Sequence, residues 1–364
     1  MGAAMRGRMR KHSGFVLIAV LAVLVILSVL ASVIGVITQR LRDEQIVHER
    51  QLREQIAMAS TRATVLYLLT SQRMTFGGLT VDDRIVLSED ERLSQRNGDE
   101  QLSYMPVGNE VALDSSAHQG LDGTRFSLQD DRGLLAINWA PPALLANYVQ
   151  AVRNGPKPAA RPFETLFNLL QDYQDPDDLY RLNSAERSEY ERLGRSPPSN
   201  RTLSTPMELR RVIGWDKALA GISDKDLNDS LTVVRSAQIN VNTAPARVLQ
   251  TLPGVDASMA QRAVAARTLT PFTSLTAFYG VAGAIPVNED LLALYPMASG
   301  TLKLWSPEGG AVMVLHWTLT PRDDGGRPWR EDYEFIHLGD ETAKQGMARP
   351  VAAKVFAEPH AAPQ

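Results

Sequence analysis

The stretch GFVLIAVLAVLVILSVLASVIGVI, residues 14–37, contains no charged side chain and decides how the rest of the chain is organised. As a helix, its roughly 24 residues would extend about 36 Å, enough to cross the hydrocarbon core of a bilayer. A cleaved secretory signal usually has an apolar core of only about 7 to 15 residues. The length therefore favours a retained helix, with residues 15–37 as its membrane-spanning part.

The residues before this stretch predict its orientation. Arg6, Arg8, Arg10 and Lys11 precede it, with no acidic residue among them. Lys and Arg are enriched on the cytoplasmic side of membrane helices. We therefore expect a cytoplasmic N-terminus, a single crossing and an extracytoplasmic body.

The helix is expected to continue beyond the membrane, to about residue 75. Residues 38–74 contain no Gly or Pro, so nothing in them breaks a helix. Apolar residues recur there at helical spacing, namely Leu41, Ile46, Leu52, Ile56, Ala59, Ala63, Leu66 and Leu69. The predicted helix over residues 15–75 is therefore amphipathic in its second half, and another part of a protein must cover its apolar side.

The composition limits the class of the remaining body. The 364 residues are 44% hydrophobic and 22% charged, which is typical of a globular protein with two or more folded units. The absence of Cys excludes disulfide frameworks, Cys-ligated zinc and a catalytic thiol. The formal net charge is −3, and it becomes −7 when the four basic residues of the leader are set aside. This acidic body argues against a dedicated nucleic-acid binder, which needs concentrated Lys and Arg.

The body shows two kinds of pattern in a defined order. Short β-like runs occupy residues 81–90 and 123–139, with a turn at 131–133, and strand patterns return over 302–338. Gly pairs at 309–310 and 325–326 indicate hairpins in the second region. Helical spacing dominates between the two regions, with breaks at Gly and Pro.

We therefore predict an α+β protein in which a helical segment is inserted into an antiparallel sheet. Residues 76–140 and 285–340 would form the two parts of the sheet, packed on the long helix, and residues 141–284 the inserted all-α domain. Residues 341–364 are rich in Ala and Pro, which predicts a disordered tail. Trp215, Trp305 and Trp317 are expected in the cores.

Gly14 and Phe15, behind a basic leader and ahead of the long helix, resemble the processing site of type IV prepilins and pseudopilins. The resemblance implies that prepilin peptidase removes residues 1–14 and that Phe15 becomes N-methylated. The family usually has Glu at the fifth mature position, where this chain has Ala19. In pilin-like filaments that Glu pairs with the N-terminal amine of a neighbour, since an unpaired carboxylate in the apolar layer is costly. Its absence indicates a tip subunit, or else a protein that does not polymerise.

Longer phrases resemble one family within this group, the K-type minor pseudopilins of the type II secretion system, also called general secretion pathway protein K. These phrases are FSLQDDRGLLAIN (126–138), DYQDPDD (172–178), SAE (184–186), PPSNRTLSTPMELRRVIG (197–214) and INVNTAPARVLQTLPG (239–254). They occur in the family's order, and the family also lacks the fifth-position Glu and carries a large helical insertion in its pilin-like sheet.

The resemblance implies a non-enzymatic role, with no catalytic residue, at the tip of the periplasmic pseudopilus. There the protein would help to initiate assembly for export of folded proteins across the outer membrane. It would be a single-pass inner-membrane protein with a periplasmic body. The implied partners are minor pseudopilins I and J, the major pseudopilin, prepilin peptidase and the inner-membrane secretion platform.

An acidic cluster is the candidate metal site. It comprises Asp172, Asp175, Asp177, Asp178 and Glu186, with Glu189 nearby. Carboxylates near turns suit Ca²⁺, although no EF-hand spacing is present and a solvated helix face is the alternative. The resemblance favours the metal, because K-type pseudopilins have structural calcium in their helical domain. Two family positions differ here, with Ser184 in place of Gly and Tyr173 in place of Trp.

Residues 239–267 predict a helix-hairpin-helix motif. Asn242 and Thr243 would cap a first helix, residues 252–255 would turn, and a second helix would run to Arg267. Such motifs can hold a DNA phosphate on hairpin amides, so a membrane-anchored DNA-binding receptor is the alternative function. Asp256 replaces the usual second hairpin Gly, and the usual Lys is absent from residues 258–261. These departures favour a packing module over nucleic-acid binding. A signal-anchored, calcium-binding adhesion module is a third interpretation.

Overall fold

The computed structural model describes residues 13–81, 104–152, 162–286, 289–321, 326–338 and 348–356. The chain divides into two compact units, Met1–Ile56 and Ala57–Gln364. The predicted strand at residues 81–90 lies almost wholly outside the described residues.

The first unit is most of one long helix, α1 (Ser13–Ser71). Among the described residues, α1 is the one helix that is long and apolar enough to cross a membrane. Two hydroxyl groups in and beside its apolar part bond to the carbonyl four residues earlier, Ser28 to Leu24 and Thr38 to Ile34, both at 2.8 Å. These bonds satisfy the hydroxyl groups without water. The predicted continuous helix is confirmed, and it ends four residues before the expected position 75.

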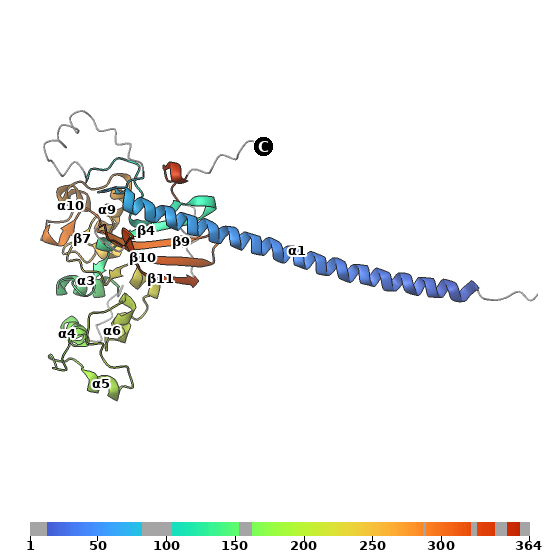
Figure 1. The fold of residues 1–364 in the computed structure, drawn as a ribbon. Helices are drawn as coiled ribbons and strands as arrows, with labels where there is room; N and C mark the ends of the chain where they lie inside the picture. Colours follow the sequence, from blue (N-terminus) through green and yellow to red (C-terminus); the bar gives the residue numbers. More distant parts are fainter. Residues whose placement is uncertain are drawn as a thin grey trace, which may run out of the picture. The chain divides into compact units, whose positions relative to one another are not determined.

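The second unit contains a five-stranded antiparallel sheet in the order β11-β10-β9-β4-β3. Its strands are β3 (Asp114–Gln119), β4 (Arg125–Asp130), β9 (Ser299–Trp305), β10 (Ala311–Leu319) and β11 (Trp329–Leu338). The strands before and after the helical segment, β4 and β9, are direct neighbours (Figure 1). The helical segment is thus an insertion between two adjacent strands, which confirms the predicted α+β class. A short hairpin of β1 (Met74–Thr75) and β2 (Gly78–Leu79) comes directly after α1.

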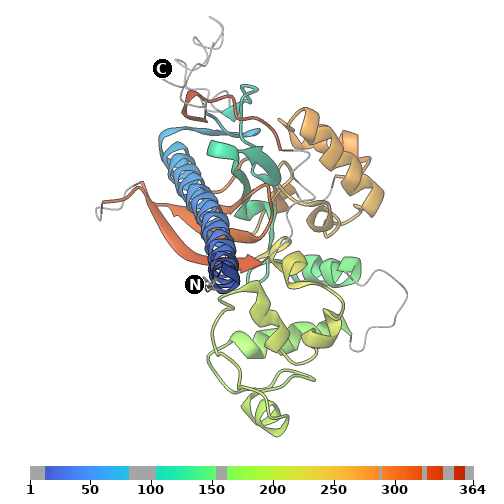
Figure 2. The same cartoon turned by 90° about the vertical axis from the view of Figure 1, so that its right-hand side faces the viewer.

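The last turns of α1, which belong to the second unit, cover one face of the sheet (Figure 2). Leu66 and Leu69 share a buried core with Trp317 and with leucines of β4, β9 and β10. Each fully buried leucine contributes roughly 1.5 to 3 kcal/mol. At the sheet edge, Arg62 forms ion pairs with Glu331 and with Glu334 of β11. The sheet therefore covers Leu66 and Leu69 of the predicted apolar side, whereas Ala59 and Ala63, which were predicted on the same side, are exposed.

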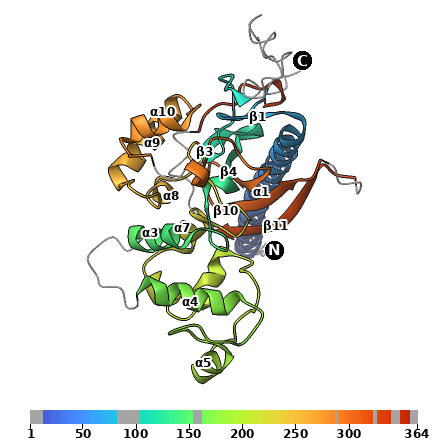
Figure 3. The same cartoon turned by 90° about the vertical axis from the view of Figure 1, so that its left-hand side faces the viewer.

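The inserted segment contains eight α-helices among the described residues. They are α3 (Pro142–Val152), α4 (Phe163–Gln174), α5 (Arg187–Arg192), α6 (Trp215–Ala218), α7 (Asp224–Asn228), α8 (Ala246–Leu249), α9 (Ala257–Leu269) and α10 (Leu275–Ala282). Figure 3 shows α8 to α10 in one group and α4 with α5 at the opposite end of the segment. One continuous apolar core, which includes Tyr148, Trp215 and Phe278, runs through both groups. The predicted burial of Trp215, Trp305 and Trp317 is confirmed.

Two short parallel strand pairs lie in the segment between β4 and β9, and 3₁₀ turns occur at several points of the described chain. β5 (Leu135–Ala136) pairs with β6 (Leu231–Thr232), and β7 (Ile239–Asn240) pairs with β8 (Leu292–Ala293). The 3₁₀ turns are η2 (Leu121–Gly123), η3 (Asp131–Gly133), η4 (Pro206–Arg211), η5 (Glu289–Leu291) and η7 (Lys354–Phe356).

The turn predicted at residues 131–133 is confirmed as η3, where the Asp130 carboxylate accepts the Arg132 amide. Two other expectations about the sheet need correction. The next strand, β5, leaves the five-stranded sheet and pairs with β6. β3 was not expected, since its sequence DSSAHQ lacks apolar alternation.

The predicted disorder of residues 341–364 is wrong for the described part of that range. Arg349 bridges to His118 of β3, and its amide and carbonyl both bond to that strand. Ala353 is buried, and Phe356 stacks on Phe126 with ring centroids 5.6 Å apart. Apolar residues between the prolines and alanines thus provide the contacts that composition alone did not indicate.

Candidate functional site

The candidate site lies where α4 ends and α5 begins. Asp172 is in the last turn of α4, Asp175 is its C-cap, and Glu186 is the N-cap of α5. One carboxylate oxygen from each of the three lies within 4.8 Å of the others. The loop between the two helices therefore brings together acids that are up to 14 positions apart in sequence.

Glu186 is the most unusual member of this cluster. It is almost fully buried, with 1% relative exposure. Its side chain faces the Glu189 amide in a capping box, but among the described residues neither carboxylate oxygen makes a hydrogen bond. Asp175 Oδ1 and the Ser184 hydroxyl are likewise buried without a partner. Burial raises the pKa of Glu186 to about 7, and the charges of Asp172 and Asp175 raise it as well. Buried charges without partners are costly and rare, so this cluster is built for a positive partner.

Arg181 supplies part of that positive charge from the loop. Its Nη1 bonds to both Asp172 Oδ1 and Asp175 Oδ2, while its backbone amide donates to Asp172 Oδ2 at 2.9 Å. None of these contacts reaches Glu186, whose oxygens make no hydrogen bond within the part of the chain that the structure describes.

The other predicted ligands do not join the cluster. Asp177 and Asp178 are exposed, and Asp177 accepts the amide of Leu179 at 2.9 Å instead. Glu189 accepts from the Tyr180 hydroxyl at 2.7 Å and from the Glu186 amide at 3.2 Å. Of the five residues predicted as metal ligands, the structure brings together Asp172, Asp175 and Glu186.

The donor set fits calcium. Hard oxygen ligands from carboxylates, at a turn that can supply carbonyls and water, are what Ca²⁺ prefers. An ion here would neutralise Glu186 and bridge the end of α4 to the start of α5. Asp172, Asp175 and Glu186 would hold it, and its contribution would be structural.

The second candidate site, the predicted helical hairpin, has a different electrostatic character. A turn at residues 252–255 connects α8 to α9, and Asp256 is the N-cap of α9. Asp256 Oδ1 accepts from the Met259 amide and from the Ser258 hydroxyl, both at 2.8 Å. The chain's own carboxylate thus takes the place at the helix N-terminus where a phosphate would have to bind. This arrangement disfavours DNA recognition.

The predicted cap of the first hairpin helix is wrong. Pro245 is the N-cap of α8, and Asn242 instead contacts residues outside the hairpin. Asn242 Nδ2 donates to the Phe272 and Leu294 carbonyls, and its Oδ1 accepts the Phe272 amide at 2.8 Å. Thr243 donates to Asp130 Oδ2 at 2.8 Å. Both residues fasten the hairpin to its surroundings, in keeping with a packing module.

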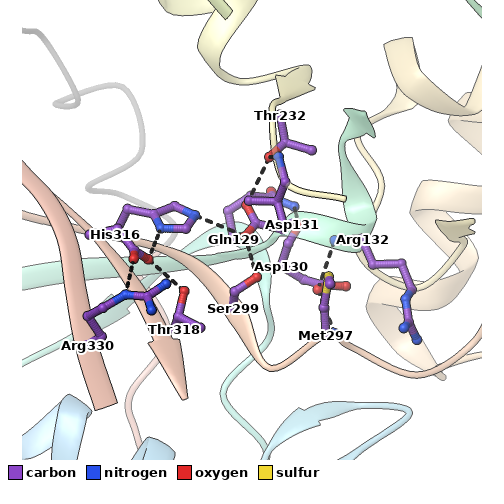
Figure 4. Close-up of polar contacts among 12 residues, drawn as sticks. Gln129, Asp130, Asp131, Arg132, Thr232, Met297, Ser299, His316, Thr318 and Arg330 are labelled. Atoms are coloured by element: carbon purple, nitrogen blue, oxygen red, sulfur yellow. Dashed lines mark hydrogen bonds and ion pairs between the residues drawn. The ribbon is translucent and has the colours of Figure 1, made fainter. Parts of the chain in front are cut away.

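A third polar cluster, which sequence reasoning missed, joins the insertion to the sheet (Figure 4). His316 of β10 lies between Asp131 and Asp332. Next to it, burial raises the pKa of Asp130 to about 6, and this carboxylate accepts from Asn240 and from the Met297 amide. The signal in the sequence was the pair Asp130-Asp131 at the end of a strand whose alternate residues Phe126 and Leu128 are apolar, because buried acids need donors.

The predicted processing residues lie at the start of α1. Gly14 and Phe15 are in its first turn, and Ala19 comes one turn later with an exposed side chain.

Comparison with known proteins finds one family whose model matches part of the chain. Residues 239–294 match the model of a family described as type II secretion system (T2SS), protein K. This segment runs from β7 through α8, α9 and α10 to β8. The match includes the quoted phrase INVNTAPARVLQTLPG (239–254) and agrees there with the resemblance to the K family.

A solved structure is also similar. A chain in the crystal structure of the GspK-GspI-GspJ complex from the type 2 secretion system of enterotoxigenic Escherichia coli is 16% identical, with a TM-score of 0.45. The similarity covers 68% of this chain and 99% of that chain. No curated protein matches.

Proposed function

We propose that this chain, which carries the protein K signature over residues 239–294, is a minor pseudopilin of a type II secretion system. That match is the observation that carries the proposal. The matched residues lie in the helical insertion between β4 and β9. This insertion is the feature that distinguishes the fold from a long helix packed on a simple sheet.

The first unit supports a role in assembly. Apolar side chains of α1 from Leu17 to Ile37 are at least half exposed within the chain. Beyond them, Leu41, Ile46, Val47, Leu52 and Ile56 are also exposed. At 100° per residue, Leu41, Leu52 and Ile56 lie within about 60° of one another on the helix, whereas Ile46 and Val47 lie on other sides of it. In the membrane lipid would cover the first group, and in a filament the helices of other subunits would cover both groups. Transfer of this surface from lipid to protein is the physical step that we propose for assembly.

We further propose a place at the tip of the pseudopilus. Ala19 offers no carboxylate to pair with the N-terminal amine of a subunit above it, and the insertion adds a bulky body beside the sheet. A subunit of this kind can start a filament without being extended at its upper end. The proposed partners are minor pseudopilins I and J, the major pseudopilin and the inner-membrane secretion platform. The N-terminus would be cytoplasmic and the body periplasmic.

The N-terminal mass of the protein from cells with and without prepilin peptidase tests this function. We expect a mature chain that starts at N-methylated Phe15 only when the peptidase is active. An unprocessed Met1 in both strains would contradict the proposal and favour the membrane-anchored DNA receptor. That alternative requires salt-dependent DNA binding, because phosphate contacts release counterions.

As a cofactor we propose one structural calcium ion at Asp172, Asp175 and Glu186. The buried, unpartnered oxygens of Glu186 support it. Calcium bound to the native state stabilises the protein by about 2.7 kcal/mol at 100 times its dissociation constant. Equal melting temperatures in calcium and in chelator would exclude the ion.

A further inference from the structure

We propose that Arg181 competes with the metal ion for the carboxylates of Asp172 and Asp175. The Arg181 guanidinium must therefore leave both carboxylates when a divalent cation binds. The inference rests on the proposed calcium site and adds an affinity-determining residue to it. Without the positive charge of Arg181, the three carboxylates would repel one another whenever the ion is absent.

The geometry puts arginine and ion in direct competition. A single nitrogen, Nη1 of Arg181, bridges Asp172 Oδ1 and Asp175 Oδ2. One oxygen of each of these residues lies within 4.8 Å of a Glu186 oxygen, so an ion that binds all three acids must approach the same place. A guanidinium and a calcium ion repel each other at such a distance. The side chain can leave, because it is 40% exposed whereas Asp172 is fully buried.

The loop around Arg181 is anchored in a way that allows this exchange. The Asn168 side chain donates to the Leu182 carbonyl at 3.0 Å, and the Leu179 amide donates to Asp177 at 2.9 Å. Both contacts hold the backbone without involving the guanidinium. The side chain of Arg181 can therefore swing toward solvent while the loop keeps its course.

Calcium titration of the purified full chain in detergent, by calorimetry, tests the competition. Arg181→Gln is expected to raise the calcium affinity on the order of tenfold, because one opposing charge no longer has to be displaced. Arg187→Gln is the matched control, since it removes the same charge from an exposed residue directly after Glu186. It is expected to change the affinity much less.

A second measurement needs no variant. Phenylglyoxal modifies accessible arginines, and mass spectrometry can report the reaction at Arg181 with Arg187 as the internal reference. Calcium is expected to speed the modification of Arg181 several-fold over that in chelator and to leave Arg187 unchanged.

The outcomes separate the calcium site from the competition. Calcium binding with equal affinities for Arg181→Gln and Arg187→Gln, or with unchanged reactivity of Arg181, overturns the competition and leaves the calcium site in place. No binding to any form rejects the ion and the competition together. Neither result bears on the pseudopilin proposal, which the N-terminal mass decides separately.

Discussion

His316 Nε2 lies 2.9 Å from Asp131 Oδ2, and this contact joins the sheet to the first turn of the inserted segment. The other ring nitrogen, Nδ1, lies 2.9 Å from Asp332 Oδ2. Because a carboxylate faces each nitrogen, both nitrogens are best satisfied when both carry a proton. A charged imidazole at this position therefore stabilises the attachment of the insertion.

The stability of the chain is expected to fall as pH rises above about 6.5, the ordinary pKa of histidine. Burial acts to lower the pKa of His316, but the hydrogen bonds and charges of Asp131 and Asp332 outweigh it and raise the pKa. A group whose pKa is raised in the folded state contributes its full stabilisation at pH values below its unfolded-state pKa. This stabilisation is lost as the pH rises through the folded-state pKa. Thermal unfolding between pH 6 and 9, followed by tryptophan fluorescence, measures this slope.

The matched variant for this test is His316→Gln, which cannot take up a proton. It is expected to be less stable than the native chain at pH 6, by about 1 to 3 kcal/mol, and to show a flatter pH dependence. An unchanged slope in His316→Gln would assign the pH dependence to other groups. Tyr333 stacks on the ring and Thr318 and Arg330 bond to Asp332, so these neighbours remain in place as a common background.

Gly133 gives a second test of the junction between sheet and insertion. A Cβ at this position would lie 2.7 Å from the Thr243 hydroxyl and 2.9 Å from the Thr243 carbonyl carbon. Since backbone cannot yield cheaply, Gly133→Ala is expected to destabilise the chain by about 1 to 3 kcal/mol. Gly280→Ala in α10 is the control, because a Cβ there would have no other described atom within 4 Å apart from the backbone of its own helix and its chain neighbours. It is expected to stabilise by about 0.5 to 1 kcal/mol, and equal effects in denaturant titrations would contradict this account.

The sequence predicted the elements that depend on local pattern. α1 is explained by an unbroken apolar run and helical spacing, and the hairpin between β9 and β10 by Gly309 and Gly310. β3 could not be predicted, because its polar residues become a strand only by pairing with β4. The start of the helical insertion was visible in the sequence, because the strand pattern changes to helical spacing at Pro141.

The sequence predicted an acidic site in this stretch, but it did not predict which of the acidic residues come together. Asp177 and Asp178 look equivalent to Asp175 in the sequence, yet the loop turns them toward solvent. Burial of Glu186 depends on how α4 and α5 meet, which no local pattern encodes. The pairing of His316 with Asp131 spans 185 positions and is equally invisible to spacing arguments.

Asp256→Ala tests whether the helical hairpin is a packing module. Loss of the N-cap bond to Met259 is expected to cost about 1 kcal/mol, and no DNA binding should appear in low salt. Ser274→Ala is the control, because Ser274 caps α10 through the same bond to the Ala277 amide. DNA binding that appears only in Asp256→Ala, and weakens with salt, would show that the carboxylate masks a phosphate site.

Glu186→Gln separates the cost of the buried charge from the gain on binding calcium. In chelator at pH 8 the native carboxylate is largely ionised, because its pKa is raised only to about 7. A neutral amide of the same shape removes a buried charge without a partner, so the variant is expected to melt at the same temperature or higher. In millimolar calcium the order should reverse, since the native chain gains stability by linkage whereas the variant lacks a charged ligand. Glu191→Gln, an exposed position in the same helix, should respond to calcium like the native chain. A native chain that is more stable than Glu186→Gln even in chelator would mean that Glu186 has a partner within the protein and does not await an ion.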